Sequence, residues 1–388
     1  MNRREFLIAT GLLCVGASMR AAARETLADR FSDLSRHFIF EYYPWYRANP
    51  YVHWDQWGRT PPIDIASNYM PKLGAYDSRS IAVMEQHAAW IAETGAGAIN
   101  VSWWGRDSDV DQLIPTLMDV MRAHDVRVAF HIEPYIDGHA VAYASDVEYL
   151  IRTYGDRRRW DTMLLLQRAD GSSGPVFKSF RTIVPPQSTD CHGITQDVSD
   201  YAADAVWRQQ TDHVRATFAR DFDHVTLLAD SLNVSRTLAA GFDGIAIYDN
   251  FVTPDTWLGH AQDFSAVDLL FSFNINPGYD QIVPRTIDPN ACYSPPRVIA
   301  DAGRIAESFA KTVAVQTMPG LSNAKRGFFL AYINSFNEWH EGHQFEPMQN
   351  AADLTPAERA IGYRNPDNGR SRLDALSNLI RYELDNSA

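Results

Sequence analysis

The stretch Phe328 to Pro347 reads FFLAYINSFNEWHEGHQFEP. An apolar run is followed directly by a short segment, Ser335 to Pro347, that contains three glutamates, two histidines, an asparagine and a tryptophan. Ionised carboxylates are costly to hold near a core, so such a cluster marks chemistry more often than packing. We therefore expect a buried strand that ends at a functional site, with the rest of the fold arranged around that end.

Apolar segments with strand character recur along the chain, and amphipathic helical stretches at 81–93, 110–123, 146–154 and 200–219 separate several of them. The strand candidates are His37–Tyr43, Ala98–Trp103, Val126–Glu133, Pro175–Phe180 (with Met163–Leu166 as an alternative), His224–Asp230, Phe242–Asp249, Leu269–Asn276 and Phe328–Phe336. Eight strands that alternate with helices predict an α/β fold, a single (β/α)8 barrel with long βα loops. An open doubly wound sheet is the alternative, because periodicity does not decide closure.

Polar and aromatic residues gather where these strands end. In a barrel, the carboxyl ends of the strands form the catalytic face, so their concentration there predicts a site. Any one of them can instead be a hydrogen-bonded core residue. The residues are Tyr42, Tyr43, Trp103, Trp104, His131, Glu133, Tyr135, Asp230, Tyr248, Asp249, Asn276, Asn337 and Glu338.

Composition narrows the class of ligand. The formal net charge of the 388 residues is -13, and no basic run is longer than Arg157–Arg159, so nucleic acid is not an expected partner. Aromatic residues make up 12% of the chain, which fits stacking on sugar rings as well as ordinary barrel packing. No linker or repeat divides the chain, and we expect one catalytic domain over 24–388 and a monomer.

The N-terminus predicts export. Arg3 and Arg4 precede an apolar stretch and the small residues Ala21–Ala23, the pattern of a twin-arginine signal peptide over 1–23. An ordinary secretory signal is the alternative. The apolar stretch is shorter than the about twenty residues that a membrane span needs, so no stable anchor is expected after cleavage. We expect a bacterial periplasmic or secreted protein; whether Cys191 and Cys292 pair is open.

Glu338 and Glu341 are the candidate catalytic residues. On a continuous strand, residues three apart point to opposite faces, so the two carboxylates can cooperate only if the chain turns, and Gly342 permits a turn. Two carboxylates at one site can divide acid and base work between them. Their separation, about 5 to 5.5 Å for retention or about 6.5 to 9.5 Å for inversion in most glycosidases, does not follow from sequence.

Other chemistries find little support in the motifs. The zincin pattern places histidines four apart on a helix, whereas His340 and His343 are three apart beside a glycine. No nucleophile elbow and no phosphate-binding loop is present. We therefore expect neither a metal nor any other cofactor.

Several short motifs, taken in order, carry a resemblance to glycoside hydrolase family 99, the endo-acting α-mannosidases and α-mannanases. The last of them, ending in Asn-Glu-Trp-His-Glu-Gly, is the most specific, and together they spread over most of the chain after the signal. The motifs are Tyr42–Tyr46, Tyr69–Tyr76, Val101–Gly105, Phe130–Tyr135, Phe242–Gly244, Pro277–Asp280 and Ser335–Pro347.

The resemblance implies a (β/α)8 barrel that cleaves within α-mannosyl chains with retention and without a metal. In such a reaction the substrate's own 2-hydroxyl attacks the anomeric carbon, and water opens the resulting 1,2-anhydro sugar. Carried onto this sequence, Glu338 is the base for the 2-hydroxyl, and Glu341 is the acid for the leaving oxygen. Asn337 orients the base or the hydroxyl.

The resemblance also implies a set of substrate-binding residues. Trp103 or Trp104 would stack on a sugar, and polar side chains would bind hydroxyls. With Asn337, the expected set is Tyr43, Trp103, Trp104, His131, Glu133, Tyr135, Tyr248, Tyr279 and Glu346.

The chain departs from its relatives at a few positions. His343 stands where a small hydroxyl residue is common, Ala75 stands where a proline is common, and Gln281–Arg285 replaces a different continuation. The leading hypothesis is an endo-α-mannosidase-like enzyme acting on mannan-like or surface polysaccharides. The alternatives are an endo-glycosidase for another α-linked polysaccharide and a carbohydrate-binding protein without turnover.

Overall fold

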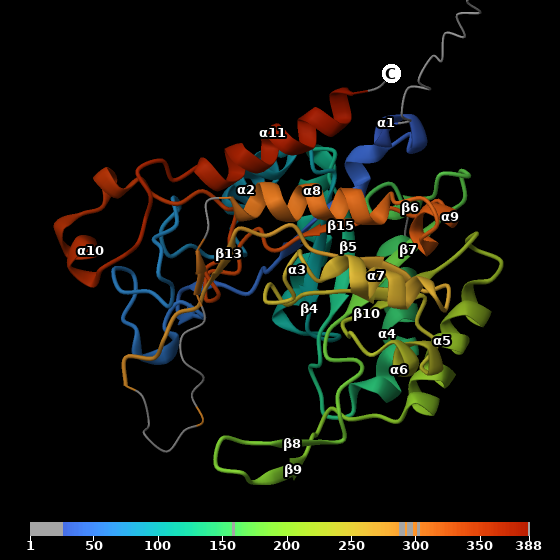
Figure 1. Cartoon of the computed structure of the whole chain (residues 1–388). Coiled ribbons are helices and arrows are strands. Elements are labelled where there is room, and N and C mark those ends of the chain that lie inside the picture. Colours follow the sequence, from blue (N-terminus) through green and yellow to red (C-terminus); the bar gives the residue numbers. More distant parts are fainter. Residues whose placement is uncertain (1–25, 157–159, 287–291, 293–297, 301–302, 387–388) are drawn as a thin grey trace, which may run out of the picture.

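The structure, a computed structural model, describes residues 26–156, 160–286, 292, 298–300 and 303–386. The expected signal peptide at 1–23 lies outside these residues. The centre of the described part is one sheet with eight strands in parallel succession (Figure 1). In spatial order they are β12 (Leu270–Ser272), β11 (Gly244–Ala246), β10 (Thr226–Ala229), β7 (Ser173–Ser179), β5 (Arg127–Ile132), β4 (Ala98–Trp103), β1 (Phe38–Tyr42) and β15 (Ala331–Ile333).

The sheet curls until its first and last strands meet. Ile275, just beyond β12, forms a parallel bridge with Ile333 of β15. The Ile275 amide donates to the Tyr332 carbonyl (2.7 Å), and the Asn334 amide donates to the Ile275 carbonyl (2.8 Å). The barrel prediction is confirmed, all eight strand candidates are strands of it, and the open-sheet alternative is excluded.

Helices follow the strands and cover the outside of the barrel (Figure 1). The four helices expected from periodicity are present, and the C-terminal helix α11 packs across α2 and α8. The helices are α1 (Leu27–Arg30), α2 (Ile81–Thr94), α3 (Asp109–Ala123), α4 (Tyr143–Leu150), α5 (Asp204–Phe218), α6 (Val234–Ala239), α7 (Trp257–Ser265), α8 (Arg304–Gln316), α9 (Ser322–Lys325), α10 (Pro356–Ile361) and α11 (Ser371–Asp385).

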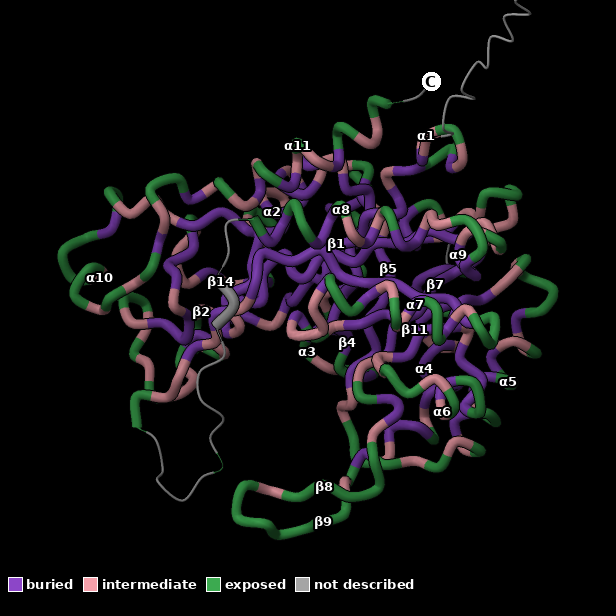
Figure 2. Tube along the Cα trace, in the orientation of Figure 1, coloured by how far each residue is buried: buried purple, intermediate pink, exposed green. Residues whose placement is uncertain are grey.

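Strand alternation divides the side chains between two layers. In β4, Ile99, Val101 and Trp103 pack in the core between strands and helices, whereas Asn100 and Ser102 face the barrel interior. The strands are buried along their length (Figure 2). The floor of the interior is a separate apolar cluster, which comprises Ile39, Ala98, Ala129, Leu164, Leu166, Val176, Leu228, Ala246, Leu270, Phe328, Leu330 and Tyr332.

The next inward position along each strand is polar. Two residues further toward the carboxyl end, the interior changes from this floor to a layer of charged and polar groups. That layer includes Glu41, Asn100, His131, Lys178, Asp230 and Tyr248. The barrel therefore has an apolar closed end and a polar end on which a site can be built.

The described residues also form four antiparallel strand pairs, one at the edge of the main sheet and three outside it. β6 (Leu165–Gln167) pairs antiparallel with β7, so the Met163–Leu166 candidate is a partner of the fourth barrel strand rather than a replacement for it. β8 (Gln187–Thr189) and β9 (Thr195–Asp197) form an exposed hairpin that projects from the barrel (Figures 1 and 2). The remaining short pairs are β2 (Arg47–Ala48) with β3 (Tyr51–Val52), and β13 (Gly278–Asp280) with β14 (Val298–Ala300).

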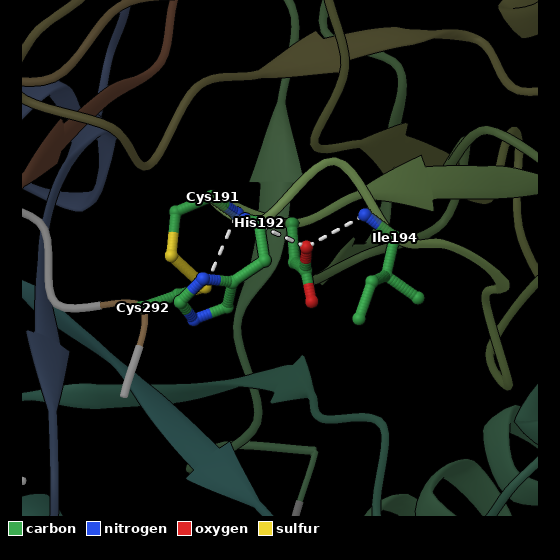
Figure 3. Close-up of a disulfide and its surroundings, with 5 residues drawn as sticks. Cys191, His192, Ile194 and Cys292 are labelled. Atoms are coloured by element: carbon green, nitrogen blue, oxygen red, sulfur yellow. Dashed lines mark hydrogen bonds between the residues drawn. A yellow bond between two sulfur atoms is a disulfide. The ribbon is translucent and has the colours of Figure 1, made fainter. Parts of the chain in front are cut away.

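A disulfide resolves the cysteine question. Cys191, at the turn of the β8–β9 hairpin, is bonded to Cys292, 101 residues later (Figure 3). The turn itself is held by Asp190, whose carboxylate accepts from the amides of His192 and Ile194, each at 2.9 Å. The bond thus ties two loops that are remote in sequence.

Within the described ranges, no helix combines the length and the apolar character that crossing a membrane requires.

Candidate active site

A cavity of about 270 Å³ opens at the polar end of the barrel. Its walls come from the segments after β1, β4, β5, β7, β11 and β15, so residues far apart in sequence meet there. The lining residues are Tyr43, Trp45, Trp104, His131, Glu133, Pro134, Phe180, Arg181, Tyr248, Glu338 and Glu341. Seven of the residues expected from sequence are therefore brought together.

Glu338 and Glu341 reach the cavity because the chain turns directly after β15. Gly342 adopts φ +68°, and a Cβ at this position would lie 2.4 Å from the Asp280 carbonyl oxygen. The left-handed conformation and the close approach both require glycine. The Glu341 carbonyl in turn accepts from the Asp280 amide (2.8 Å), which fixes the turn against β13.

The Glu341 carboxylate is held by three side chains. Oε2 lies 2.6 Å from the Tyr248 hydroxyl and 2.7 Å from His343 Nε2, while Oε1 lies 3.1 Å from the Tyr279 hydroxyl. Burial would raise the pKa of Glu341, but the hydrogen bond and charge of His343 and the two tyrosine hydroxyls outweigh it and lower the pKa. In the free protein, Glu341 is therefore the ionised member of the pair.

The Glu338 carboxyl has fewer stabilising partners. Its Oε1 accepts the backbone amide of His340 at 2.9 Å, and the His340 ring lies 3.5 Å away. Burial, and then the His53 side chain, lower the pKa of His340 to about 3, so this imidazole is neutral. Burial and the negative charge of Glu341 raise the pKa of Glu338 well above its ordinary value. The two neighbouring carboxyls thus differ in proton affinity.

A charged network lies directly beneath the cavity. Lys178 Nζ lies 2.6 Å from Glu41 Oε1, and both side chains are fully buried. Glu41 Oε2 also accepts from Asn100 (3.0 Å) and from His131 Nδ1 (3.1 Å). Burial would raise the pKa of Glu41, but Lys178 and His131 lower it to about 2.

His131 carries this network into the cavity wall. Burial alone would lower its pKa, but the charges of Glu41 and Glu133 outweigh burial and raise it. Nδ1–H donates to Glu41, and Nε2 has no partner among the described residues. Glu133 accepts from the Ser102 hydroxyl at 2.8 Å. The wall therefore presents a buried donor with unused capacity, which is costly unless a ligand or water satisfies it.

Of the two adjacent tryptophans, Trp104 lines the cavity. It is 38% exposed, and its indole N–H donates to Ser102 at 2.9 Å. Trp103 is fully buried on the other side of the strand, where it donates to Asp111 at 2.8 Å. Tyr135 also lies outside the cavity lining, and its hydroxyl donates to Asp146 at 2.7 Å.

The other expected residues act through neighbours. The Asn337 amide accepts from the Tyr43 amide (2.8 Å) and donates to the Tyr43 carbonyl (3.0 Å), so it fixes the backbone of a wall residue. Glu346 is fully buried behind the wall and accepts from Tyr76 (2.8 Å) and Trp339 (2.9 Å). Tyr279 lies outside the lining and reaches it through Glu341.

Some lining residues were not expected from the sequence. Trp45 follows the expected residue Tyr43 by the two-residue period of a strand, and that period was the available signal. Phe180 is the last residue of the fourth strand candidate, where its position at a strand end was the signal. Arg181 was also missed, and its Nε donates to Asp200 at 2.6 Å.

The histidines of the Ser335–Pro347 segment have separate partners. His340 Nε2 lies 2.9 Å from the His53 carbonyl, whereas His343 binds Glu341. In the described part of the chain, the one cluster with metal-ligand spacing is Cys191, His192 and Cys292, and both of its sulfurs are in the disulfide.

Comparison with known proteins agrees with this arrangement. Residues 34–165 match the sequence model of glycosyl hydrolase family 99. A glycoprotein endo-alpha-1,2-mannosidase-like protein of Mus musculus is 28% identical over 340 residues, which cover 79% of this chain and 68% of that protein. A glycoprotein endo-alpha-1,2-mannosidase of the same organism is 26% identical over 362 residues, 84% of this chain and 71% of that protein.

The fold has a solved counterpart. The GH99 endo-alpha-mannosidase from Bacteroides thetaiotaomicron superposes with a TM-score of 0.64 at 22% identity, covering 91% of this chain and 99% of that one. The chain thus resembles glycosyl hydrolase family 99 in the sequence of residues 34–165, is similar over most of its length to endo-α-mannosidases, and shares its fold with a solved enzyme of that family.

Proposed function

We propose that the protein is a retaining endo-glycosidase that cleaves α-mannosidic linkages within mannan-like or surface polysaccharides. The observation that carries the proposal is the placement of Glu338 and Glu341 on one cavity, with opposite shifts in pKa. Groups whose environments push their pKa values apart are suited to divide acid and base work. Trp104 and Trp45 supply aromatic faces for sugar rings, and His131 supplies an unpaired donor for a hydroxyl.

The proposed reaction uses the 2-hydroxyl of the substrate as the nucleophile. Glu338 takes the proton of this hydroxyl while its oxygen attacks the anomeric carbon, and Glu341 gives a proton to the departing glycosidic oxygen. Water then attacks the anomeric carbon of the 1,2-anhydro sugar and passes its proton to Glu341. The 2-oxygen regains its proton from Glu338, so atoms and protons balance over the cycle.

These roles require a proton to move from Glu338 to Glu341 before the first step. In the free protein the pKa directions favour the proton on Glu338 and the charge on Glu341, whereas the first step needs the reverse. Because the two carboxyls interact, they titrate as a pair that holds one proton in the intermediate pH range. We propose that substrate binding transfers this proton to Glu341, since a hydroxyl that donates to Glu338 favours its ionised form.

The test is product analysis with the mature protein, residues 24–388. It is incubated with α-mannan and with other α-linked polysaccharides, each with and without EDTA, and new reducing ends are followed. NMR of the first products reports the anomeric configuration. Internal cleavage of mannan with α-configured first products, unaffected by EDTA, is expected. A β-configured first product contradicts retention, loss of activity in EDTA contradicts the metal-free mechanism, and binding without cleavage identifies a carbohydrate-binding protein.

We also propose that the mature domain works outside the cytoplasm. The disulfide between Cys191 and Cys292 supports this, because such bonds persist in oxidising compartments and are rare in reducing ones. Mass spectrometry of the protein recovered from its native compartment tests both expectations. It is expected to find an N-terminus near residue 24 and two sulfurs without free thiol; an uncleaved, reduced chain contradicts the proposal.

A further inference from the structure

His343 is a buried histidine that lies beside Glu341 of the proposed catalytic pair. Its side chain has no exposed surface, and Nε2 lies 2.7 Å from Glu341 Oε2. Its carbonyl accepts from the Ser335 amide at 3.1 Å, so its backbone is attached to the segment that leaves β15. The ring is thus placed from two sides, by the Gly342 turn and by this hydrogen bond.

The surroundings of the ring select which nitrogen donates to Glu341. Nδ1 is buried and has no partner among the described residues, whereas Nε2 lies 2.7 Å from Glu341 Oε2. Between the two neutral tautomers, a proton on Nδ1 would leave a buried donor without an acceptor, and this is costly. The proton on Nε2 is therefore the one that the site uses, and it donates to Glu341.

This donation distinguishes the two oxygens of the Glu341 carboxylate. Oε2 accepts from His343 and from the Tyr248 hydroxyl (2.6 Å), which uses the two positions that an oxygen of this type offers. Oε1 accepts the longer bond from the Tyr279 hydroxyl, at 3.1 Å. Oε1 is therefore the oxygen with capacity left to exchange a proton with a ligand.

We propose that His343 is a positioning residue for Glu341: its Nε2–H occupies Oε2, directs proton exchange to Oε1, and sets on which of the two pocket glutamates the shared proton rests. The inference rests on the proposed function, because it assumes that Glu341 exchanges a proton during turnover. It goes beyond that function, since it assigns the control of the proton to a residue that does not touch the substrate.

The direction in which the pKa of Glu341 changes follows from the loss of the hydrogen bond from His343. Loss of the donor removes stabilisation from the ionised form of Glu341 only, so its pKa rises. The pH limb of kcat/KM that reports Glu341 then moves to higher pH by about one unit, the size expected for one hydrogen bond to a carboxylate. The other titratable groups that face the pair stay in place: Tyr248, Tyr279, His340, Glu133, His131 and Arg181.

The experiment compares three variants of the mature protein with the unchanged one, with thermal unfolding recorded for each. His343→Phe keeps a ring and removes the donor, whereas His343→Gln keeps a donor at similar reach. His37→Phe is the matched control, because His37 is also buried but bonds the Phe329 carbonyl (2.6 Å) at the opposite end of β1. kcat and KM for α-mannan are measured across pH.

The expected result is a shift of one limb in His343→Phe, a return toward the original profile in His343→Gln, and no shift in His37→Phe. The proposal is overturned if both limbs of the pH profile stay in place in both His343 variants, so that only stability or KM changes. An equal shift in the Gln and Phe variants also overturns it, since the donor would then not be the cause.

Which limb of the kcat/KM pH profile moves in His343→Phe tests the roles proposed for the two glutamates separately from the role proposed for His343. If the alkaline limb moves, Glu341 acts in its protonated form, as proposed for the acid. If the acidic limb moves, His343 still controls Glu341, but the acid and base roles must be exchanged. The two proposals therefore fail by different outcomes.

Discussion

Four carboxyls near the polar end of the barrel form two contrasting pairs. Glu338 and Glu341 line the cavity, and their partners leave at least one oxygen able to meet a ligand. Glu41 and Glu346 lie behind the cavity wall, and their partners are other buried side chains. Glu41 accepts from a lysine, a histidine and an asparagine. Glu346 accepts from a tyrosine and a tryptophan.

Burial does not separate Glu338 from Glu346. Glu338 is 3% exposed and Glu346 is not exposed at all, and both come from the same short segment. The difference lies in what satisfies the carboxyl. A group satisfied by the fold contributes to stability, whereas a group that faces a cavity is available for chemistry.

The largest expected effect is on turnover, from the cavity pair. Glu338→Gln and Glu341→Gln each keep the shape of the side chain and remove its acid and base function. General acid or base catalysis contributes about 10² to 10⁴-fold, and we expect kcat to fall by about 10³-fold in each variant. Steady-state kinetics and calorimetric binding of a manno-oligosaccharide are the measurements. Near-normal rates in either variant contradict the role of that residue.

The next effect is on stability, from the buried pair below the cavity. Lys178→Met leaves Glu41 without its closest cation, and removal of one partner of a buried pair costs about 3 to 5 kcal/mol. Denaturant unfolding is expected to show this loss. Lys178→Met with Glu41→Gln is the matched variant, in which no unpaired charge remains and most of the stability returns. A single variant as stable as the original contradicts the internal role of the pair.

Glu346→Gln tests the contrast within the Ser335–Pro347 segment. Tyr76 and Trp339 both donate to Oε2, so the glutamine oxygen can keep these two bonds, while its NH2 group replaces Oε1, which lies 3.3 Å from His87 Nε2. A changed polar contact at this buried position costs about 1 to 3 kcal/mol. We expect a lower midpoint of thermal unfolding and a much smaller change in kcat than in Glu341→Gln. The reverse pattern, unchanged stability with lost binding, would support the substrate contact that the sequence predicts for Glu346.

The smallest expected effect concerns the aromatic wall. Trp104→Ala removes a face on which a sugar can stack, and Trp103→Ala removes a core side chain of the same type. Aromatic stacking contributes about 0.5 to 1.5 kcal/mol in addition to the burial of apolar surface. Trp104→Ala is therefore expected to raise KM by about tenfold at most and to leave the stability unchanged. Trp103→Ala is expected to lower stability by about 3 to 5 kcal/mol. Equal effects on KM would contradict their assignment to opposite sides of β4.

The architecture could be predicted because its signals are local. Each barrel strand is a short, mostly apolar run, and all eight strands were predicted from sequence. The bounds of β4 agree with the prediction, β7 begins two residues before the predicted start, and the other six strands are shorter than predicted. The catalytic face followed from the barrel, and with it most of the cavity lining.

The features that the sequence did not predict depend on where individual side chains point and on contacts between residues that are distant in sequence. Trp103 ends β4 and Trp104 follows it, and strand alternation predicts that their side chains point to opposite sides. Glu41 and Lys178 are charges inside apolar strands, and only the fold shows that they meet. No local pattern predicts the disulfide between Cys191 and Cys292. The same holds for the hydrogen bond that His343 donates to Glu341.

The disulfide has a consequence for how the protein withstands proteases. The β8–β9 hairpin is exposed along both strands, and exposed hairpins are preferred sites of cleavage. A cut anywhere between residues 191 and 292 leaves two fragments that Cys191 and Cys292 still join. A molecule cut in β9 therefore keeps the segments that build its cavity wall, Phe180 and Arg181 on one fragment and Glu338 and Glu341 on the other, in a single covalent unit. A cut in β8, which precedes Cys191, does not have this protection.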